Sequence, residues 1–392
     1  MMRCIICGSP TNFPIIDLPP IPIDTNRIWS SRDAASAVPK APINLVHCRN
    51  CDHVFNRSYD DDLVDYEEDY ENSQMFSPLF RKYCQDISDQ LITRHCVRHK
   101  HIVEIGGGKG DFLRIICERG DNLGVSFDPS YRPEPGDDIP KNVRFITDYY
   151  TAKYAQEPVD LIVCRQVLEH LWNARDLIAT VREAIGDRYD IIVYFEVPNG
   201  DFILREQAFW ELHYHHCSYF TKASIIKLFT ECGFRVLEVQ ENFGGQFLAI
   251  QACAANELAS FRTLPQSHLS KNATAALCEV FETAFRERVK SWLDLVDRFR
   301  AERKRVVAWG AGAKGVTFLN LVNPSGDVIS HVVDINPRKV GRFVPGSAQE
   351  IIPPEVLREL RPEVVLLMNG IYRQEIGSVL GALGLNSTLL VA

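Results

Sequence analysis

The chain has 392 residues, of which 46% are hydrophobic and 24% are charged, and its formal net charge is -8. This composition is that of an ordinary globular protein with room for two or three domains. The negative charge argues against a nucleic-acid partner, because such binding depends on Lys and Arg that neutralise phosphates. No apolar run approaches the roughly 18 residues that a membrane helix needs, and "MMRCIICGSP" lacks the pattern of a signal peptide. We therefore expect a cytoplasmic protein without a membrane partner.

Four cysteines near the N-terminus form two C-x2-C pairs, Cys4 with Cys7 and Cys48 with Cys51. In a reducing compartment such pairs are thiols or metal ligands rather than disulfides. Two tight turns that each present two thiolates suit a tetrahedral zinc ion, and four thiolates leave no open position for chemistry. We predict a structural zinc site in a zinc-ribbon-like domain over residues 1–60, with a long Pro-rich insert. A set of buried free cysteines is the alternative.

The stretch "HIVEIGGGKGDFLRIICERG" predicts an apolar strand that ends at Glu104, then a glycine loop and an amphipathic helix. Such a unit binds nucleotides at the N-terminus of its helix. The loop glycines are Gly106, Gly108 and Gly110. Asp111 occupies the position that would complete a G-x-G-x-x-G fingerprint, so a pyrophosphate there would meet a carboxylate. The loop therefore favours a ligand that carries an ammonium group and no phosphate.

Further strands follow over residues 61–255. "NLGVSFDPS" ends at Asp128, where a carboxylate would bind ribose hydroxyls, and "VRFITDYY" ends a third strand at Asp148. A fourth strand and helix, a fifth strand and a closing hairpin are expected in "PVDLIVCRQVLEHL", "YDIIVYFEVPN" and "FRVLEVQENFGGQFLAIQACA". This alternation predicts an α/β fold with a doubly wound parallel sheet.

A helical linker is expected over residues 256–300, followed by a smaller α/β unit over 301–392 that opens with "RVVAWGAGAKGVTFLNLV". Gly310, Gly312 and Gly315 complete a formal G-x-G-x-x-G after an apolar strand. The spacing leaves open an NAD-dependent or bifunctional enzyme. The length of the unit argues against this reading, because it is about half that of a complete Rossmann domain with its own substrate part.

The run from Glu104 to Asp148 resembles class I S-adenosylmethionine-dependent methyltransferases. Their signature is an acidic residue, an apolar residue and G-x-G-x-G, followed by a ribose-binding acid and a third acid near the adenine. Together with the cysteine pairs and the C-terminal "GAGAKGVTFLN" and "DINPRKVGRFVPG", the whole chain resembles the three-domain sugar C-methyltransferases. These enzymes methylate C3 of a nucleotide-linked 4-keto-6-deoxysugar.

The resemblance implies S-adenosyl-L-methionine as cofactor, structural zinc, and a nucleotide-linked sugar as the small-molecule substrate. It also implies a degenerate Rossmann-like C-terminal domain that packs over the catalytic domain and helps to hold the nucleotide sugar. Lys314 at a helix start and the pair Arg338 and Lys339 are then expected to contact phosphates. The alternative for each is a solvated basic edge.

The stretch "FWELHYHHCSYFT" contains three histidines within four positions. The family's motif at this point is Tyr-His-Glu-His, followed two residues later by Tyr-Phe-Ser. His216 takes the place of the family's catalytic acid–base histidine, whereas His215 replaces the Glu, and His213 and Tyr214 exchange the first pair. The resemblance implies that His216 removes a proton next to a ketone, with His215 and Tyr214 shaping its protonation.

Two further residues join the expected site by resemblance. His170 in "VLEHL" matches a histidine near the acceptor, although a Glu-His pair is widespread among methyltransferases of many kinds. Tyr70 in "DYENSQMF" matches a tyrosine in the segment that closes over the substrate, and plain packing is its alternative.

Other readings stay open. His213 and His215 would project together from a strand and could bind a metal ion, or the histidines could simply fill a core or an edge. The altered motif also allows an O- or N-methyltransferase of the same architecture. A non-catalytic zinc-ribbon adaptor is a third possibility, against which the intact glycine loop and both following acids argue.

Overall fold

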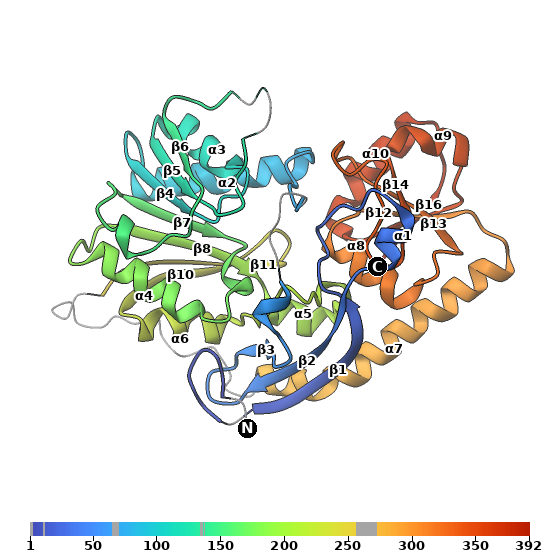
Figure 1. Cartoon of the computed structure of the whole chain (residues 1–392), viewed down its shortest axis with the longest axis horizontal. Coiled ribbons are helices and arrows are strands. Elements are labelled where there is room, and N and C mark those ends of the chain that lie inside the picture. Colours follow the sequence, from blue (N-terminus) through green and yellow to red (C-terminus); the bar gives the residue numbers. More distant parts are fainter. Residues whose placement is uncertain (1–2, 11, 65–69, 134–135, 137, 256–272) are drawn as a thin grey trace.

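The computed structural model describes residues 3–10, 12–64, 70–133, 136, 138–255 and 273–392. Within these ranges the chain forms a four-stranded, a seven-stranded and a five-stranded sheet. In Figure 1 the seven-stranded and five-stranded sheets lie on opposite sides of the molecule, and the N-terminal strands run below and between them. The first part of the expected linker, 256–272, lies outside the described residues. No helix in the described ranges is both long enough and apolar enough to cross a membrane.

The N-terminal sheet has the order β1-β2-β3-β9 and is antiparallel. Its strands are β1 (Asn12–Pro22), β2 (Lys40–Cys48), β3 (Val54–Asn56) and β9 (Ser218–Tyr219), and α1 (Arg32–Ser36) lies in the insert. Strand β9 comes from the histidine stretch, far along the chain, and pairs Val54 with Tyr219. The backbone N–H of Asn56 also donates to the Cys217 carbonyl at 3.0 Å. The N-terminal unit therefore supports the segment that carries the histidines.

The seven-stranded sheet has the order β10-β11-β8-β7-β4-β5-β6. Its strands are β4 (His101–Ile105), β5 (Leu123–Phe127), β6 (Val143–Ile146), β7 (Leu161–Arg165), β8 (Ile192–Pro198), β10 (Phe234–Asn242) and β11 (Phe247–Ala254). The first five are parallel and the last two form the antiparallel hairpin, as the sequence predicts. The helices here are α2 (Pro78–His95), α3 (Asp111–Gly120), α4 (Ala174–Ile185), α5 (Gly200–Glu206) and α6 (Lys222–Glu231).

Strands β4 and β7 are neighbours, and the chain leaves them in opposite directions of the sheet order. Open α/β sheets bind their ligands at such a switch point, beside the carboxyl ends of the strands. The 3-10 turns that follow include η3 (Leu168–His170), after β7, and η4 (Phe209–Glu211), after α5. The predicted glycine loop and both histidine stretches are thus brought to one edge of the sheet.

The C-terminal sheet is parallel, with the order β14-β13-β12-β15-β16. Its strands are β12 (Val306–Trp309), β13 (Ile329–Val333), β14 (Glu350–Ile352), β15 (Val364–Leu367) and β16 (Thr388–Val391). The helices are α7 (Ala273–Ala301), α8 (Ala313–Val322), α9 (Leu357–Leu360) and α10 (Arg373–Ala382). The α/β fold class expected from the sequence is confirmed in both larger sheets.

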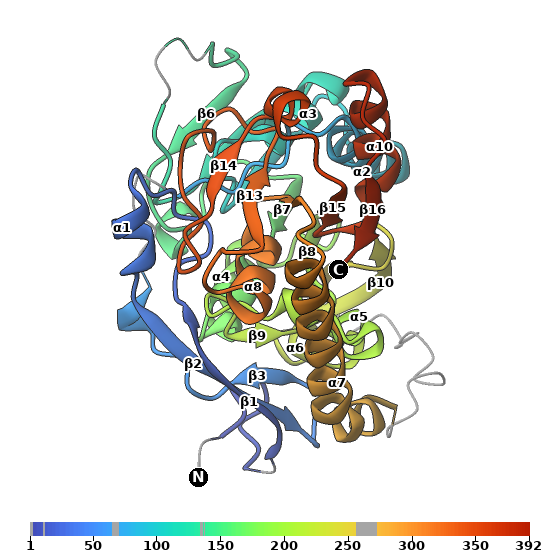
Figure 2. The same ribbon diagram turned by 90° about the vertical axis from the view of Figure 1, so that its right-hand side faces the viewer.

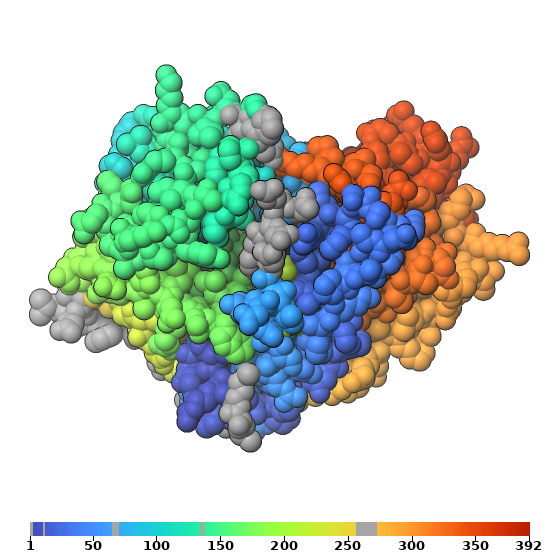
Figure 3. Space-filling view, in the orientation of Figure 1, coloured from blue at the N-terminus to red at the C-terminus, as the bar shows by residue number. Residues whose placement is uncertain are grey.

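One apolar core joins the three units. Helix α7 contacts β1, α5 and α8, and Figure 2 shows it running along the molecule beside α8. Trp292 of α7 packs edge-on against Phe318 of α8, with ring centroids 5.0 Å apart. Phe209 of η4 stacks on the same Phe318 at 5.7 Å. Figure 3 shows residues of the N-terminal unit, in blue, packed between the other two. Because burial of apolar surface is the main favourable contribution to folding, we expect the units to be stabilised together.

Candidate active site

A cavity of about 780 Å³ lies between the glycine loop after β4, the histidine stretches and the start of α8. The residues that the sequence predicts in the site and that line this cavity are Tyr70, Glu104, Gly106, Gly108, Asp128, His170, His216, Lys314 and Lys339. His213 lines it as well. A volume of this size is ordinary for a site that encloses small molecules.

The glycine loop requires glycine for steric reasons. Gly110 has φ +73°, and a Cβ there would lie 2.1 Å from the Phe145 ring. At Gly107 a Cβ would lie 2.1 Å from a carboxyl oxygen of Glu104. Burial raises the pKa of Glu104 to about 7, and Ser126 donates a hydrogen bond to this carboxyl at 3.1 Å. The loop thus presents backbone and an acidic group to the cavity, which suits a cofactor with an ammonium group.

The two predicted ribose and adenine acids differ in their placement. Asp128 follows β5 and lines the cavity, and its carboxylate accepts hydrogen bonds from the N–H groups of Gly108 at 2.6 Å and Ser130 at 2.8 Å. Asp148 is not among the lining residues, and its carboxylate accepts from Lys153 and Tyr154. The cavity wall at this point is instead formed by the next two residues, which are Tyr149 and Tyr150.

Three histidines meet in the cavity wall. The ring centroid of His216 lies 4.9 Å from that of His170 and 4.9 Å from that of His213. His215 does not line the cavity, but its ring lies 6.1 Å from those of His170 and Tyr70. The histidine stretch forms a turn rather than the strand that a metal pair of His213 and His215 would need.

Tyr214 lies away from the cavity. Its side chain is fully buried, and its hydroxyl accepts from the Asp60 N–H at 3.0 Å and donates to the Ser58 carbonyl at 3.3 Å. Its ring stacks on Tyr59 with centroids 5.7 Å apart. Tyr214 therefore connects the histidine stretch to the N-terminal unit. Because it does not line the cavity, we assign it a structural role rather than the predicted catalytic one.

Burial keeps the cavity histidines neutral. It lowers the pKa of His170 to about 4 and holds the pKa of His216 well below its ordinary value. The neighbouring carboxyl of Glu169 has its pKa raised to about 8 by the same cause. His170 Nδ1 lies 3.1 Å from the carbonyl of His215, which can only accept, so His170 carries its proton on Nδ1. Among the described residues, Nδ1 of His216 is buried without a hydrogen-bond partner.

In the part of the chain that the structure describes, two groups of side chains have a spacing that could hold a metal ion. In the first, the sulfurs of Cys4 and Cys51 are 3.6 Å apart, as are those of Cys7 and Cys48. Zn–S bonds of about 2.3 Å in a tetrahedron place sulfurs roughly 3.8 Å apart, so the four thiolates fit zinc. The second group contains Glu169, His170 and His216, whose ligand atoms lie within 4.8 Å of one another.

The three predicted phosphate contacts already have partners in the protein. Lys314 forms an ion pair with Glu211 and donates to Gln246 at 2.6 Å. Lys339 is buried and donates to the carbonyl of Ala311 at 3.2 Å. Arg338 lies 3.5 Å from the Glu71 carboxylate and is not among the lining residues.

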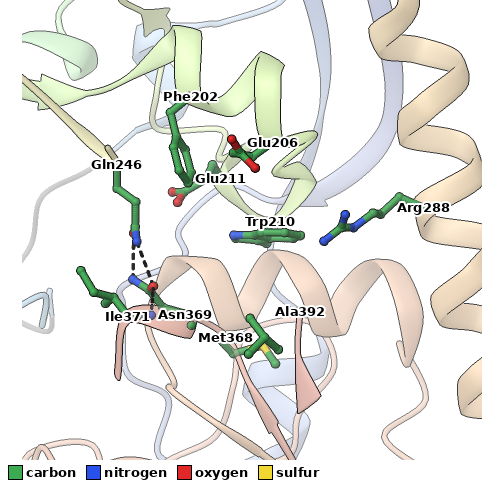
Figure 4. Close-up of a pocket in the computed structure, with 12 residues that line it drawn as sticks. Phe202, Glu206, Trp210, Glu211, Gln246, Arg288, Met368, Asn369, Ile371 and Ala392 are labelled. Atoms are coloured by element: carbon green, nitrogen blue, oxygen red, sulfur yellow. Dashed lines mark hydrogen bonds between the residues drawn. The ribbon is translucent and has the colours of Figure 1, made fainter. Parts of the chain in front are cut away.

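A smaller pocket of about 260 Å³ adjoins the cavity and shares Glu211, Met368 and Asn369 with it. Figure 4 shows the reciprocal hydrogen bonds of Gln246 with Asn369, at 2.8 and 3.0 Å, beside this pocket. These bonds join the β10–β11 hairpin to the C-terminal unit. Lys314 donates to the same Gln246, so the start of α8 is fixed against the unit of the seven-stranded sheet.

Sequence reasoning missed two groups at the site, one from the C-terminal unit and one from the seven-stranded sheet itself. Thr317 of α8 contacts His213, with 2.8 Å between Oγ1 and Nδ1. Arg165, in the cavity wall, pairs with the fully buried Glu196 at 2.8 Å. Arg165 and Glu196 face each other on two adjacent parallel strands. The predicted strands could therefore have indicated this ion pair. No local pattern points to Thr317.

Comparisons with known proteins agree with this geometry. A family profile described as a methyltransferase domain matches residues 73–239, and one described as a C-methyltransferase C-terminal domain matches residues 258–384. C-methyltransferase NovU of Streptomyces niveus is 25% identical over 388 residues, which cover 95% of this chain and 91% of that protein. Together these matches fit the three-domain C-methyltransferase family. The chain is an S-adenosylmethionine-dependent methyltransferase, which excludes the reading as a non-catalytic adaptor.

Solved structures similar to this chain include two other methyltransferases. The 1,6-didemethyltoxoflavin-N1-methyltransferase of Burkholderia thailandensis is 15% identical, with a TM-score of 0.35, and the match covers 46% of this chain and 82% of that one. The magnesium protoporphyrin IX methyltransferase of Synechocystis PCC 6803 is 15% identical, with a TM-score of 0.33, covering 45% and 84%.

Proposed function

We propose that this methyltransferase methylates carbon, at C3 of a nucleotide-linked 4-keto-6-deoxysugar. The observation that carries the proposal is the group of three neutral histidines, His170, His213 and His216, in the wall of the cavity that the glycine loop enters. A carbon nucleophile requires a base, and a neutral imidazole can accept the proton. Similarity to NovU, a C-methyltransferase, supports carbon as the acceptor atom.

His216 is the base in this proposal. It takes the proton from C3, the electrons of the C–H bond form the enolate, and the negative charge develops on the ketone oxygen. The enolate carbon then forms the new bond to the methyl group, while the electrons of the broken S–CH₃ bond stay on sulfur. The proton leaves His216 for solvent, which restores the neutral imidazole. Tyr70 and His170 line the same cavity, which supports a proposed role for both in contacting the sugar oxygens.

The cofactor supplies a methyl group activated by its sulfonium charge. The groups that would hold it are Glu104, the loop glycines Gly106, Gly108 and Gly110, and Asp128 after β5. The carboxyl of Glu104 faces the loop and suits the ammonium group, and Asp128 suits the ribose hydroxyls. Because a Cβ at Gly107 would meet the side chains of Glu104 and Ser126, the backbone of the loop is the surface on which the cofactor would lie.

For the nucleotide part, we propose Lys314 and Lys339 as the cations nearest to the phosphates. Both line the cavity at the start of the C-terminal unit. Lys314 would have to share its charge with Glu211. Zinc bound by Cys4, Cys7, Cys48 and Cys51 is proposed as a structural ion, since the four thiolates leave no open position.

The test uses labelled S-adenosylmethionine with a panel of nucleotide-linked keto-sugars and their reduced counterparts. Only the keto form has an acidified α-proton, so we expect label in keto-sugars alone. Methylation of the reduced sugars would instead indicate an O-methyltransferase, and label on an amino group an N-methyltransferase. His99→Asn serves as a control for histidine variants, because His99 is exposed and its positive φ of 53° is one that Asn tolerates.

A further inference from the structure

The hydroxyl of Thr317 determines where His213 carries its proton. Thr317 Oγ1 donates to the Leu212 carbonyl at 3.2 Å and lies 2.8 Å from Nδ1 of His213. A hydroxyl has one proton to donate, and a carbonyl can only accept it. With that proton on the Leu212 carbonyl, the Thr317 oxygen accepts from His213. Nδ1 of His213 therefore carries a proton, and Nε2 is the nitrogen left to the cavity.

The position of His213 is fixed on its backbone side as well. The Tyr219 hydroxyl accepts from the His213 N–H at 3.2 Å and donates to the His213 carbonyl at 3.1 Å. The side chain is 2% exposed. Burial, with the charge of Lys314 and the nearby rings of His170 and His215, holds the pKa of His213 well below its ordinary value. A neutral ring with its proton on Nδ1 has a lone pair on Nε2.

We propose that Thr317 fixes His213 in this tautomer, so that Nε2 of His213 accepts a hydrogen bond from a hydroxyl or amino group of the acceptor. The inference rests on the proposed function. The ring of His213 lies 4.9 Å from that of His216, so we place the recognised group on the carbon that His216 deprotonates. A ketone or ether oxygen at the same point would be repelled by the lone pair of Nε2. The site is therefore specific for acceptors that carry a hydrogen-bond donor on the methylated carbon.

Thr317 is a positioning residue in this account and His213 a specificity-determining one. Lys314 and Thr317 are three residues apart on α8, hence on one face of the helix. Lys314 pairs with Glu211, and Thr317 contacts His213. One face of α8, in the C-terminal unit, therefore contacts both residues of the histidine stretch. This gives the C-terminal unit a part in acceptor choice beyond holding a nucleotide.

The first test compares two keto-sugars that differ only in a hydroxyl on C3, which the second lacks. An uncharged hydrogen bond contributes about 0.5–1.5 kcal/mol, so the wild type should favour the hydroxylated sugar roughly two- to tenfold in kcat/KM. Thr317→Val should bring this ratio close to one, and Thr317→Ser, which keeps the hydroxyl, should restore it. An unchanged ratio in Thr317→Val would overturn the inference.

The second test does not depend on the acceptor. Nitrogen-15 NMR of labelled histidines distinguishes a protonated from an unprotonated Nε2, and the His213→Gln variant identifies the His213 signals. We expect an unprotonated Nε2 in the wild type and in Thr317→Ser, and a mixture of tautomers in Thr317→Val. A protonated Nε2 in the wild type would refute the assigned tautomer. If neither keto-sugar is methylated, the proposed function fails, while this spectrum still decides the role of Thr317.

Discussion

At the scale of single residues, the carboxylate of Asp128 accepts from the N–H groups of Gly108 and Ser130. Asp128 also lines the cavity, where we propose that it binds the ribose. Hydrogen bonds to a charged group contribute about 1.5–3 kcal/mol, so Asp128→Ala should weaken S-adenosylmethionine binding roughly ten- to a hundredfold. Calorimetry measures this directly. Normal affinity in the variant would contradict the cofactor assignment.

His216 should affect chemistry rather than cofactor binding. Loss of a general base costs on the order of 10²–10⁴ in rate. His216→Asn should therefore lower kcat strongly and leave the affinity for S-adenosylmethionine nearly unchanged. The matched variant His99→Asn, at an exposed histidine, should keep wild-type kcat. Near-normal turnover of His216→Asn would mean that another group removes the proton.

The glycine loop and Asp128, which line the cavity, have a local signal in the sequence. Both stand at fixed offsets from one strand, so their spacing alone places them. Asp148 has the expected offset, yet its carboxylate turns to Lys153 and Tyr154, whose approach depends on the chain that follows. Thr317 reaches His213 from 104 positions away in sequence. No rule based on the spacing of residues in the sequence predicts a contact over such a distance along the chain.

At the scale of elements, the zinc knuckles should matter for stability before they matter for chemistry. Zinc would join the start of the chain to the end of β2, and β3 then pairs with β9 beside the histidines. Cys48→Ser should release the ion and lower Tm by roughly 5 °C or more, since each kcal/mol lost lowers Tm by about 2–4 °C at such sizes. Elemental analysis and thermal unfolding measure both effects.

The control for this change is Cys96→Ser, at an exposed free cysteine, which should keep both zinc and Tm. Wild-type protein purified without any bound zinc would refute the site. The pairing of β9 with β3 was not predicted from the sequence, because a two-residue strand has no periodicity to read. The longer parallel strands were predicted, since each is an apolar run bounded by turn signals.

At the scale of the whole molecule, one core should make the units unfold together. Trp292 of α7 is 8% exposed and packs on Phe318 of the C-terminal unit. Removal of such a ring lowers the free energy of unfolding by about 3–5 kcal/mol. Trp292→Ala should therefore lower the temperature of the single unfolding transition. Leu293→Ala, at the exposed neighbouring position, should change this temperature little. Separate transitions, of which only one moves, would contradict a shared core.

The central claim is that the methyl group is transferred to carbon. The direct measurement is the NMR spectrum of the product made with S-adenosylmethionine that carries a ¹³C-labelled methyl group, from a nucleotide-linked 4-keto-6-deoxysugar labelled with ¹³C at C3. A methyl on C3 shows one-bond carbon–carbon coupling to that ring carbon, which the account predicts. A methyl signal without this coupling, at the chemical shift of an O-methyl or N-methyl group, would contradict it.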